Sequence, residues 1–255
     1  MSLLRQQVAA QRPLAPVLGA LAALTLACWG YLLLVRAAPV DAPWAMPMTA
    51  SWSVADALAM WAMWAVMMAA MMLPSAAPMV AAYAHTLRGP RSVVHGSTPL
   101  FVAAYVAVWA GFAGAAAAGQ WGLHQAGLVD AMGVSRSGWL AAGALLVAGG
   151  YQFSDLKHTM LRRCRSPLGF ILGSWREGPR GAAVMGLHHG VLCLGCCWLL
   201  MGLLFVLGVL NLWWVAVLAT AVLLEKVTRS PQVPRVLGVV LVGAGLLVLA
   251  QTVLA

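Results

Sequence analysis

Long uncharged apolar runs alternate along the chain with short polar stretches that hold most of its charges. A run of about 20 apolar residues lets a helix cross the bilayer core of about 30 Å. The pattern predicts an all-α, polytopic transmembrane helix bundle with about seven spans. We place these spans at residues 14–35, 55–87, 97–120, 137–153, 181–207, 210–226 and 233–254.

Two of these boundaries rest on run length. Arg5 and Arg12 precede the first run, as in a signal peptide. That run is about 22 residues, longer than the roughly 7–15 of a signal-peptide core, so we interpret it as a retained anchor. Residues 181–224 form one uncharged stretch that would overshoot the bilayer as a single helix. We therefore place a break near Gly208 and Asn211.

Composition supports the membrane class. The chain is 63% hydrophobic and only 8% charged, whereas soluble domains carry about 25% charged residues. Its net charge of +9 would suggest nucleic-acid binding in a soluble protein. Here the cations lie between apolar segments, where they report orientation and headgroup contact. The sequence therefore predicts the lipid bilayer as a partner and no nucleic acid.

The positive charges predict the orientation. If the N-terminus is cytoplasmic, all of the 15 Lys and Arg residues except Arg36 and Arg136 fall on the cytoplasmic side. We expect a cytoplasmic tail at 1–13, a single transmembrane domain at 14–254 and a C-terminus outside. A basic cytoplasmic loop is expected at 154–180, either solvated at the headgroups or docking a cytoplasmic partner.

Methionines concentrate in the second predicted span, which holds seven of the 14 in the chain. At about 100° per residue they form two adjacent rows on a helix. One row contains Met60, Met63, Met67 and Met71, and the other contains Met68, Met72 and Met79. Thioether sulfur is a soft ligand that selects Cu(I). The alternative is that methionine fills irregular gaps between helices.

The fifth predicted span carries a cysteine face. Cys193 and Cys196 share a helical arc with His189, and Cys197 lies about 40° beyond Cys193. Spacings of three and four residues bring side chains within about 5–6 Å at Cβ, close enough for two thiolates to hold one metal ion. The alternative is that the cysteines are small apolar packing residues.

The copper interpretation requires the two sulfur-rich helices to meet, which the sequence alone does not show. Met63, Met67 and Met71 can lie level with the three cysteines near the bilayer midplane, because the two helices run in opposite directions. Small residues predict where helices approach closely. One set lies in the third span (Gly111, Ala115 and Gly119) and another on the cysteine helix (Gly186, Gly190 and Gly195).

Three further residues near the cytoplasmic face are candidates. Glu225 ends the sixth span, so it is either a functional carboxylate on an access path or an interfacial acid satisfied by nearby cations. Cys164 and Met160 are four residues apart in the basic loop and could pass a soft metal inward or outward.

Several motifs resemble those of bacterial predicted metal-binding integral membrane proteins, a family labelled as a domain of unknown function. The resemblance covers roughly residues 55–230. Its parts are 64–67 and 70–75, Lys157 with 164–167, His189-Gly190, the CLGCCW motif at 193–198 with Met201, and Glu225-Lys226. It implies metal binding and adds Met201 to the candidate ligands. Met160 stands where the family pattern has a first loop cysteine, but methionine keeps a soft ligand.

Three functional hypotheses follow. The first is a copper-handling protein that transports Cu(I) or delivers it to a membrane metalloenzyme, because soft sulfur ligands favour copper. The second is a non-catalytic accessory subunit of a larger membrane complex. The third is a thiol-redox protein using Cys193 and Cys196. No catalytic residue is predicted under the first two. The resemblance implies the bacterial cytoplasmic (inner) membrane as the location, with the C-terminus periplasmic.

Overall fold

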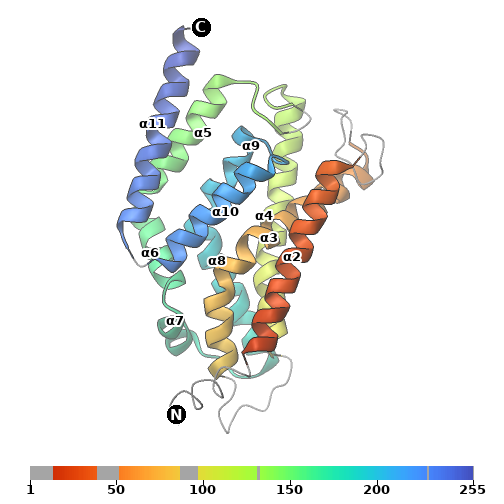
Figure 1. Cartoon of the computed structure of the whole chain (residues 1–255), viewed down its shortest axis with the longest axis vertical. Helices are drawn as coiled ribbons and strands as arrows, with labels where there is room; N and C mark the ends of the chain where they lie inside the picture. The colour runs from red at the N-terminus through yellow and green to blue at the C-terminus, as the bar shows by residue number, and fades with distance from the viewer. Residues whose placement is uncertain (1–13, 39–51, 87–96, 131–132, 229, 255) are drawn as a thin grey trace, which may run out of the picture.

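The computed structural model describes residues 14–38, 52–86, 97–130, 133–228 and 230–254, and it confirms the predicted all-α class (Figure 1). The helices are α2 (Ala15–Ala37), α3 (Val54–Thr86), α4 (Ser97–Gln125), α5 (Gly138–Tyr151), α6 (Asp155–Cys164), α7 (Pro167–Ser174), α8 (Gly178–Gly202), α9 (Leu204–Leu207), α10 (Leu212–Val227) and α11 (Gln232–Leu254). The predicted tail at 1–13, with Arg5 and Arg12, lies outside the described residues.

Five helical segments are long and apolar enough to cross a membrane: α2, α3, α4, the continuous segment Gly178–Leu207 and α11. The runs predicted at 137–153 and 210–226 form α5, with 14 residues, and α10, with 16. At 1.5 Å per residue these helices are about 21 and 24 Å long, shorter than the bilayer core. The multi-pass class is confirmed with five long spans, and α5 and α10 are shorter helices beside them.

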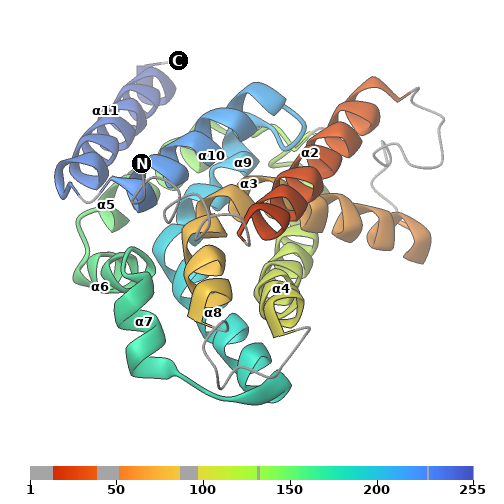
Figure 2. The same cartoon turned by 60° about the horizontal axis from the view of Figure 1, so that its bottom comes forward.

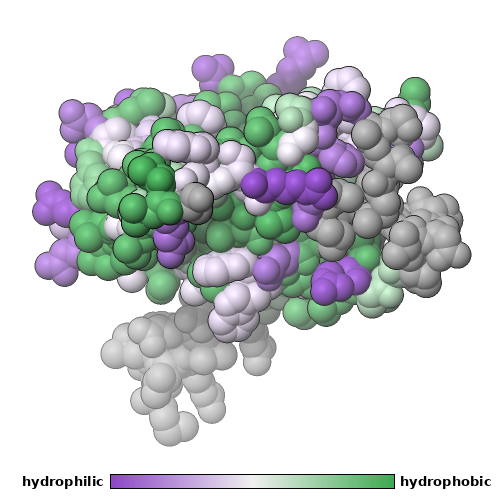
Figure 3. Space-filling view, turned by 90° about the horizontal axis from the view of Figure 1, so that it is seen from above, coloured by the Kyte–Doolittle hydropathy of each residue, from purple (hydrophilic) through white to green (hydrophobic). Residues whose placement is uncertain are grey.

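Apolar side chains point outward on the helices at the rim of the bundle. Leu26 and Leu34 on α2 are both 70% exposed, and Leu247 on α11 is 68% exposed. A soluble domain would bury such residues, whereas a bilayer solvates them. Figure 3, which looks onto the upper end of Figure 1, shows hydrophilic side chains exposed among hydrophobic ones. Apolar residues are thus exposed on the outer helices, and this end presents polar and apolar side chains together.

The predicted break after the cysteine helix is confirmed. Gly208 closes α9 with φ +90°, a left-handed conformation that glycine adopts without a steric penalty. The amide of Asn211 then donates to the Gly208 carbonyl at 3.2 Å, and α10 begins at the next residue. This turn sends α10 back along α8 toward the end of the bundle where α6 lies (Figure 1).

The predicted basic loop at 154–180 is largely helical, and α6 has one buried face and one exposed face. Ser154 caps α6 by accepting a 3.2 Å hydrogen bond from the Lys157 amide. One face of α6 packs on α8 and buries Lys157 and Cys164, while Arg162 and Arg163 remain exposed. Figure 2 shows α6 and α7 beside α8 at this end of the molecule.

Glycines of α8 allow a close approach to α4, as predicted. A Cβ on Gly186 would clash with the carbonyl oxygen of Phe101, and one on Gly190 would lie 2.7 Å from Val108 Cγ2. Small residues let two helix backbones come this near. This contact holds the lower half of α8 firmly against α4.

The small residues predicted to pack in the third span bring no helix backbone close within the described part of the chain, although a Cβ on Gly119 would lie 3.8 Å from Phe205 Cζ. Gly111, Ala115 and Gly119 are exposed on α4, and a Cβ on Gly111 would meet nothing within 4 Å. The prediction was wrong because a stripe of small residues does not show which side of a helix meets its neighbour. Close approach occurs instead between α5 and α11, where a Cβ on Gly149 would lie 2.8 Å from the Val242 nitrogen.

Candidate metal centre

A cluster of four buried cysteines lies where α6 packs on α8. We use the name cysteine cluster for Cys164 on α6 and Cys193, Cys196 and Cys197 on α8. The Sγ atoms of Cys196 and Cys197 lie 3.0 and 3.1 Å from the carbonyl oxygen of Cys193. Spacings of three and four residues on α8 therefore turn both thiols back toward Cys193, as helix geometry requires.

Cys164 comes from a separate helix and joins this group. It is 8% exposed. Its hydrogen-bonding interactions with Cys193 and then with Cys196, together with burial, raise the pKa of the Cys164 thiol well above its ordinary value. Cys164 thus lies against the cysteines of α8. The sequence placed it in a loop, without a reason to bring it to α8.

The thioether that meets the cysteine cluster belongs to Met72. The Cys197 Sγ lies 3.9 Å from the Met72 Sδ, a contact between α8 and α3. The predicted meeting of a methionine helix with the cysteine helix is thus present, but through a residue of the adjacent methionine row. Met63, Met67 and Met71 are buried in the core. At about 100° per residue they point roughly 180°, 140° and 100° away from Met72 around α3.

A buried lysine faces the same cysteines. Lys226, near the end of α10, is 8% exposed. Its Nζ lies 2.8 Å from Cys193 Sγ and donates to Ser75 Oγ at 2.9 Å. The hydroxyl of Tyr105 also lies 3.0 Å from Cys193 Sγ. An ammonium at this distance stabilises an anionic sulfur. Of the four cysteines, Cys193 is therefore the one whose thiolate form this geometry stabilises.

Glu225 is held in an ion pair with Lys157. Its carboxylate accepts hydrogen bonds of 2.9 and 2.8 Å from the Lys157 ammonium, and the two side chains are 1% and 0% exposed. Arg165 also donates to the Glu225 backbone carbonyl. Of the two interpretations of Glu225, the structure therefore shows the acid satisfied by nearby cations. The pair joins α6 to α10 beside the cysteine cluster.

His189 is buried one turn below Cys193 on α8. Its ring lies 5.4 Å from that of Tyr105 and 5.6 Å from that of Phe170, centroid to centroid. Its Nδ1 is buried, and the described residues supply no hydrogen-bond partner for it. A buried polar atom without a partner calls for an explanation, and a ligand that it coordinates would provide one. His189 is therefore an available nitrogen donor next to the thiols.

The other two predicted residues lie near the cysteine cluster without a sulfur contact of their own. Met201 is fully buried on α8, one turn beyond Cys197. Met160 covers Gly195, where a Cβ would lie 3.2 Å from the Met160 Cγ. Gly195 thus lets α6 approach α8 closely enough to deliver Cys164.

The cluster borders a cavity of about 200 Å³. Its walls are Ser75, Pro78, Met79, Cys164, Arg165, Pro167, Lys226 and Val227. Within the described ranges, no three His, Cys, Asp or Glu side chains form a preformed metal site. A soft monovalent ion also uses thioether sulfur, and Met72 supplies one beside Cys197. The donor set therefore fits a soft or borderline metal ion better than a hard one.

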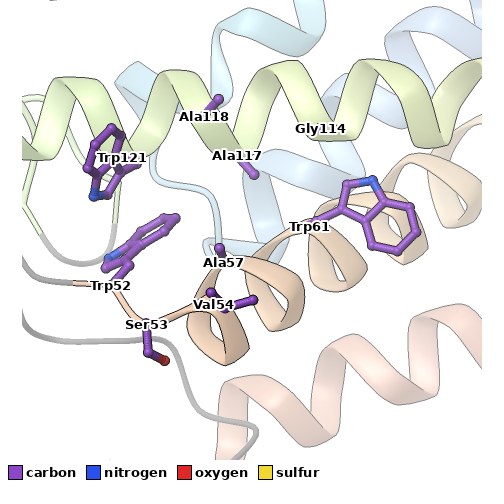
Figure 4. Close-up of a pocket in the computed structure, with 9 residues that line it drawn as sticks. All are labelled: Trp52, Ser53, Val54, Ala57, Trp61, Gly114, Ala117, Ala118 and Trp121. Carbon is purple, nitrogen blue, oxygen red and sulfur yellow. The ribbon is translucent and has the colours of Figure 1, made fainter.

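A second hollow is lined by aromatic residues and carries no sulfur. Its volume is about 460 Å³ and it lies between the start of α3 and the end of α4 (Figure 4). Trp52, Trp61 and Trp121 form much of its wall, and the Trp61 indole donates to the Ala110 carbonyl at 2.9 Å. Tryptophan is typical of the membrane–water interface. This hollow therefore lies at the end of the bundle opposite to α6 and α7.

Residues 61–248 match a family model described as PpoB2, a copper chaperone. The chain belongs to the PpoB2 family of copper chaperones. The matched region contains the cysteine cluster, Met72 and Lys226. No curated protein and no solved structure matches the chain.

Family membership selects among the three functional hypotheses. A copper chaperone binds copper and passes it to a recipient, so copper is the cargo of this chain. Five membrane-length apolar segments place that delivery at a membrane. The copper-handling hypothesis is therefore confirmed at the level of the family, and the predicted metal-binding resemblance agrees with it.

Proposed function

We propose that the protein carries copper as Cu(I), bound by Cys193 and Cys197 with the Met72 thioether, and delivers it to a membrane metalloenzyme. Cys164, Cys196 and His189 stand beside these three as exchange ligands. The observation that carries the proposal is the 3.9 Å contact between Cys197 Sγ and Met72 Sδ. It brings thiol and thioether sulfur from two helices together in a buried place, which is the chemistry that selects Cu(I).

The remaining donors suit a chaperone, which must release what it binds. Cu(I) moves between proteins when an incoming thiolate replaces a bound one, so spare sulfurs next to the ion favour stepwise exchange. Cys164 and Cys196 are spare sulfurs of this kind, since both interact with the rest of the cluster. The cavity that Cys164 and Lys226 line is also bordered by Arg165 and Pro167, at the junction of α6 and α7.

We also propose that all seven apolar helices lie across the bacterial cytoplasmic membrane, with the N-terminus cytoplasmic and the C-terminus periplasmic. Figure 1 supports this, because successive apolar helices alternate in direction, α2 begins at the lower end and α11 finishes at the upper end. Arg162, Arg163, Arg176 and Arg180 are exposed in or beside α6 and α7 at the lower end. A basic end of this kind is typical of the cytoplasmic side.

The same cations indicate that the metal centre lies at a different depth in the membrane from the one predicted from the sequence. The sequence placed the cysteines near the bilayer midplane. Cys164, however, adjoins the exposed Arg163 in sequence, and charged side chains avoid the hydrocarbon core. Because Cys164 joins the cysteine cluster, the site lies closer to the basic end than to the midplane. A cytoplasmic carrier would then reach it through the cavity.

Copper stoichiometry tests this proposal. We expect protein purified without oxygen and loaded with Cu(I) to hold about one copper per chain, and the Cys193/Cys196/Cys197→Ser variant to hold almost none, because only sulfur holds Cu(I) strongly here. Elemental analysis of metal per chain gives the result. Equal, near-zero copper in both proteins would contradict the proposal and favour the accessory-subunit hypothesis.

The two methionine rows can be separated by substitution. Met72→Leu keeps a similar shape but removes the thioether, so we expect the Cu(I) affinity to fall about tenfold, or about 1.4 kcal/mol. Met67→Leu removes a buried sulfur of the other row and should leave the affinity unchanged. Competition with a colorimetric Cu(I) chelator measures both. A larger loss for Met67→Leu than for Met72→Leu would assign the site to the predicted row instead.

A further inference from the structure

Lys226 brings a positive charge to a place where a cation is to be bound. Its side chain is buried, and its ammonium lies 2.8 Å from Cys193 Sγ. Its neighbour in sequence is an acid, Glu225, whose two carboxylate oxygens both accept hydrogen bonds from Lys157. The charge of Lys226 is therefore directed at the cysteine cluster and is not cancelled by that carboxylate.

The charge balance depends on the valence of the bound ion. Two thiolates with one Cu(I) form a centre of charge −1, which the ammonium of Lys226 neutralises. Two thiolates with a divalent ion form a neutral centre, which the same ammonium leaves with an uncompensated charge of +1. Burying an uncompensated charge is costly. With Cys193 and Cys197 as the two thiolate ligands, the arrangement therefore favours a monovalent ion.

The size of the effect follows from distance. A metal–sulfur bond is about 2.3 Å for zinc, so an ion on Cys193 would lie within about 5 Å of the Lys226 Nζ. With an effective dielectric constant of about 20, one additional unit of charge at that distance changes the relative affinity on the order of 100-fold.

We propose that Lys226 is the residue that makes the cysteine cluster select monovalent copper over divalent metal ions. The proposal rests on the assignment of copper to this cluster, and it adds a determinant of specificity that touches the ligands without being one. Ser75 contributes by holding the ammonium in place, since its hydroxyl accepts from Lys226 Nζ at 2.9 Å.

Lys226→Met tests the proposal, because methionine has a similar shape without the charge. In the full-length protein in detergent, we expect the Cu(I) affinity to fall and the Zn(II) affinity to rise, moving their ratio by about 100-fold. Lys226→Arg keeps the charge and should keep the ratio within about tenfold of wild type. Arg163→Met removes an exposed cation from the same end of the bundle and should leave the ratio unchanged, since solvent screens it.

Chelator competition for Cu(I) and for Zn(II), with each metal alone, provides the two affinities. An unchanged ratio in Lys226→Met would overturn the proposal, as would a ratio that moves equally in Arg163→Met. Lys226→Gln, which is also uncharged, gives the same comparison if the methionine variant does not fold. Loss of Cu(I) binding in the triple serine variant with no shift in Lys226→Met would refute only the role of Lys226. Absence of Cu(I) binding in wild type would refute the site itself.

Discussion

Glu225→Gln is expected to lower the free energy of unfolding by about 3–5 kcal/mol, because it leaves the Lys157 ammonium buried without its counter-ion. Lys157 is 0% exposed, and its ammonium donates hydrogen bonds to both carboxylate oxygens of Glu225. Glutamine keeps the size of the side chain but not the charge. Denaturant or thermal unfolding in detergent, followed by circular dichroism, measures the change.

Two companion variants separate the ion pair from other causes. Glu177→Gln removes the charge of an exposed glutamate and should change stability by less than about 0.5 kcal/mol. Replacing the pair with apolar residues, as Lys157→Met with Glu225→Leu, should recover most of the lost stability, because neither charge is then left buried alone. A double variant as unstable as Glu225→Gln would show that the pair does not account for the loss.

Cys193→Ser is expected to weaken Cu(I) binding by more than about 100-fold, since even partners that do not touch a metal cost about 10–100-fold when removed. Cys193 is the cysteine whose Sγ contacts both Lys226 and Tyr105. Oxygen in its place is a hard ligand that Cu(I) binds poorly. Anaerobic titration against a Cu(I) chelator measures the loss.

Cys28→Ser provides the matched comparison. Cys28 is also a buried free cysteine, but it belongs to α2. If Cu(I) binds to the cysteine cluster, Cys28→Ser keeps the wild-type affinity. Equal losses in Cys28→Ser and Cys193→Ser would indicate general damage to the fold and contradict the special position of Cys193.

The helices and the cysteine face could be predicted from the sequence because both are local. Apolar run length determines where membrane helices form, and a spacing of three and four residues determines which side chains share a face. The break at Gly208 is local in the same sense, because a single glycine allows the left-handed turn.

What could not be predicted depends on how helices rotate against one another. The sequence does not distinguish Met71 from Met72 until the side of α3 that faces α8 is known, and only the structure shows that the Met72 sulfur lies beside Cys197. Cys164 is 29 residues from Cys193, and no sequence spacing links two separate helices. From the sequence, the charge of Lys226 is used to orient the protein in the membrane, and Lys226 is assigned no role at the site. The sequence feature that points to such a role is the Glu225-Lys226 pair at the end of an apolar run.

In the last turn of α10, two adjacent residues of opposite charge point in different directions. Glu225 faces Lys157 on α6, while Lys226 faces Cys193 on α8. Inserting one residue ahead of them would rotate both side chains by about 100° around the helix axis. Such a rotation would carry the ammonium away from the sulfurs and remove the acid from its own counter-ion. Natural relatives and engineered variants should therefore tolerate substitutions along α10 far better than any change in its length.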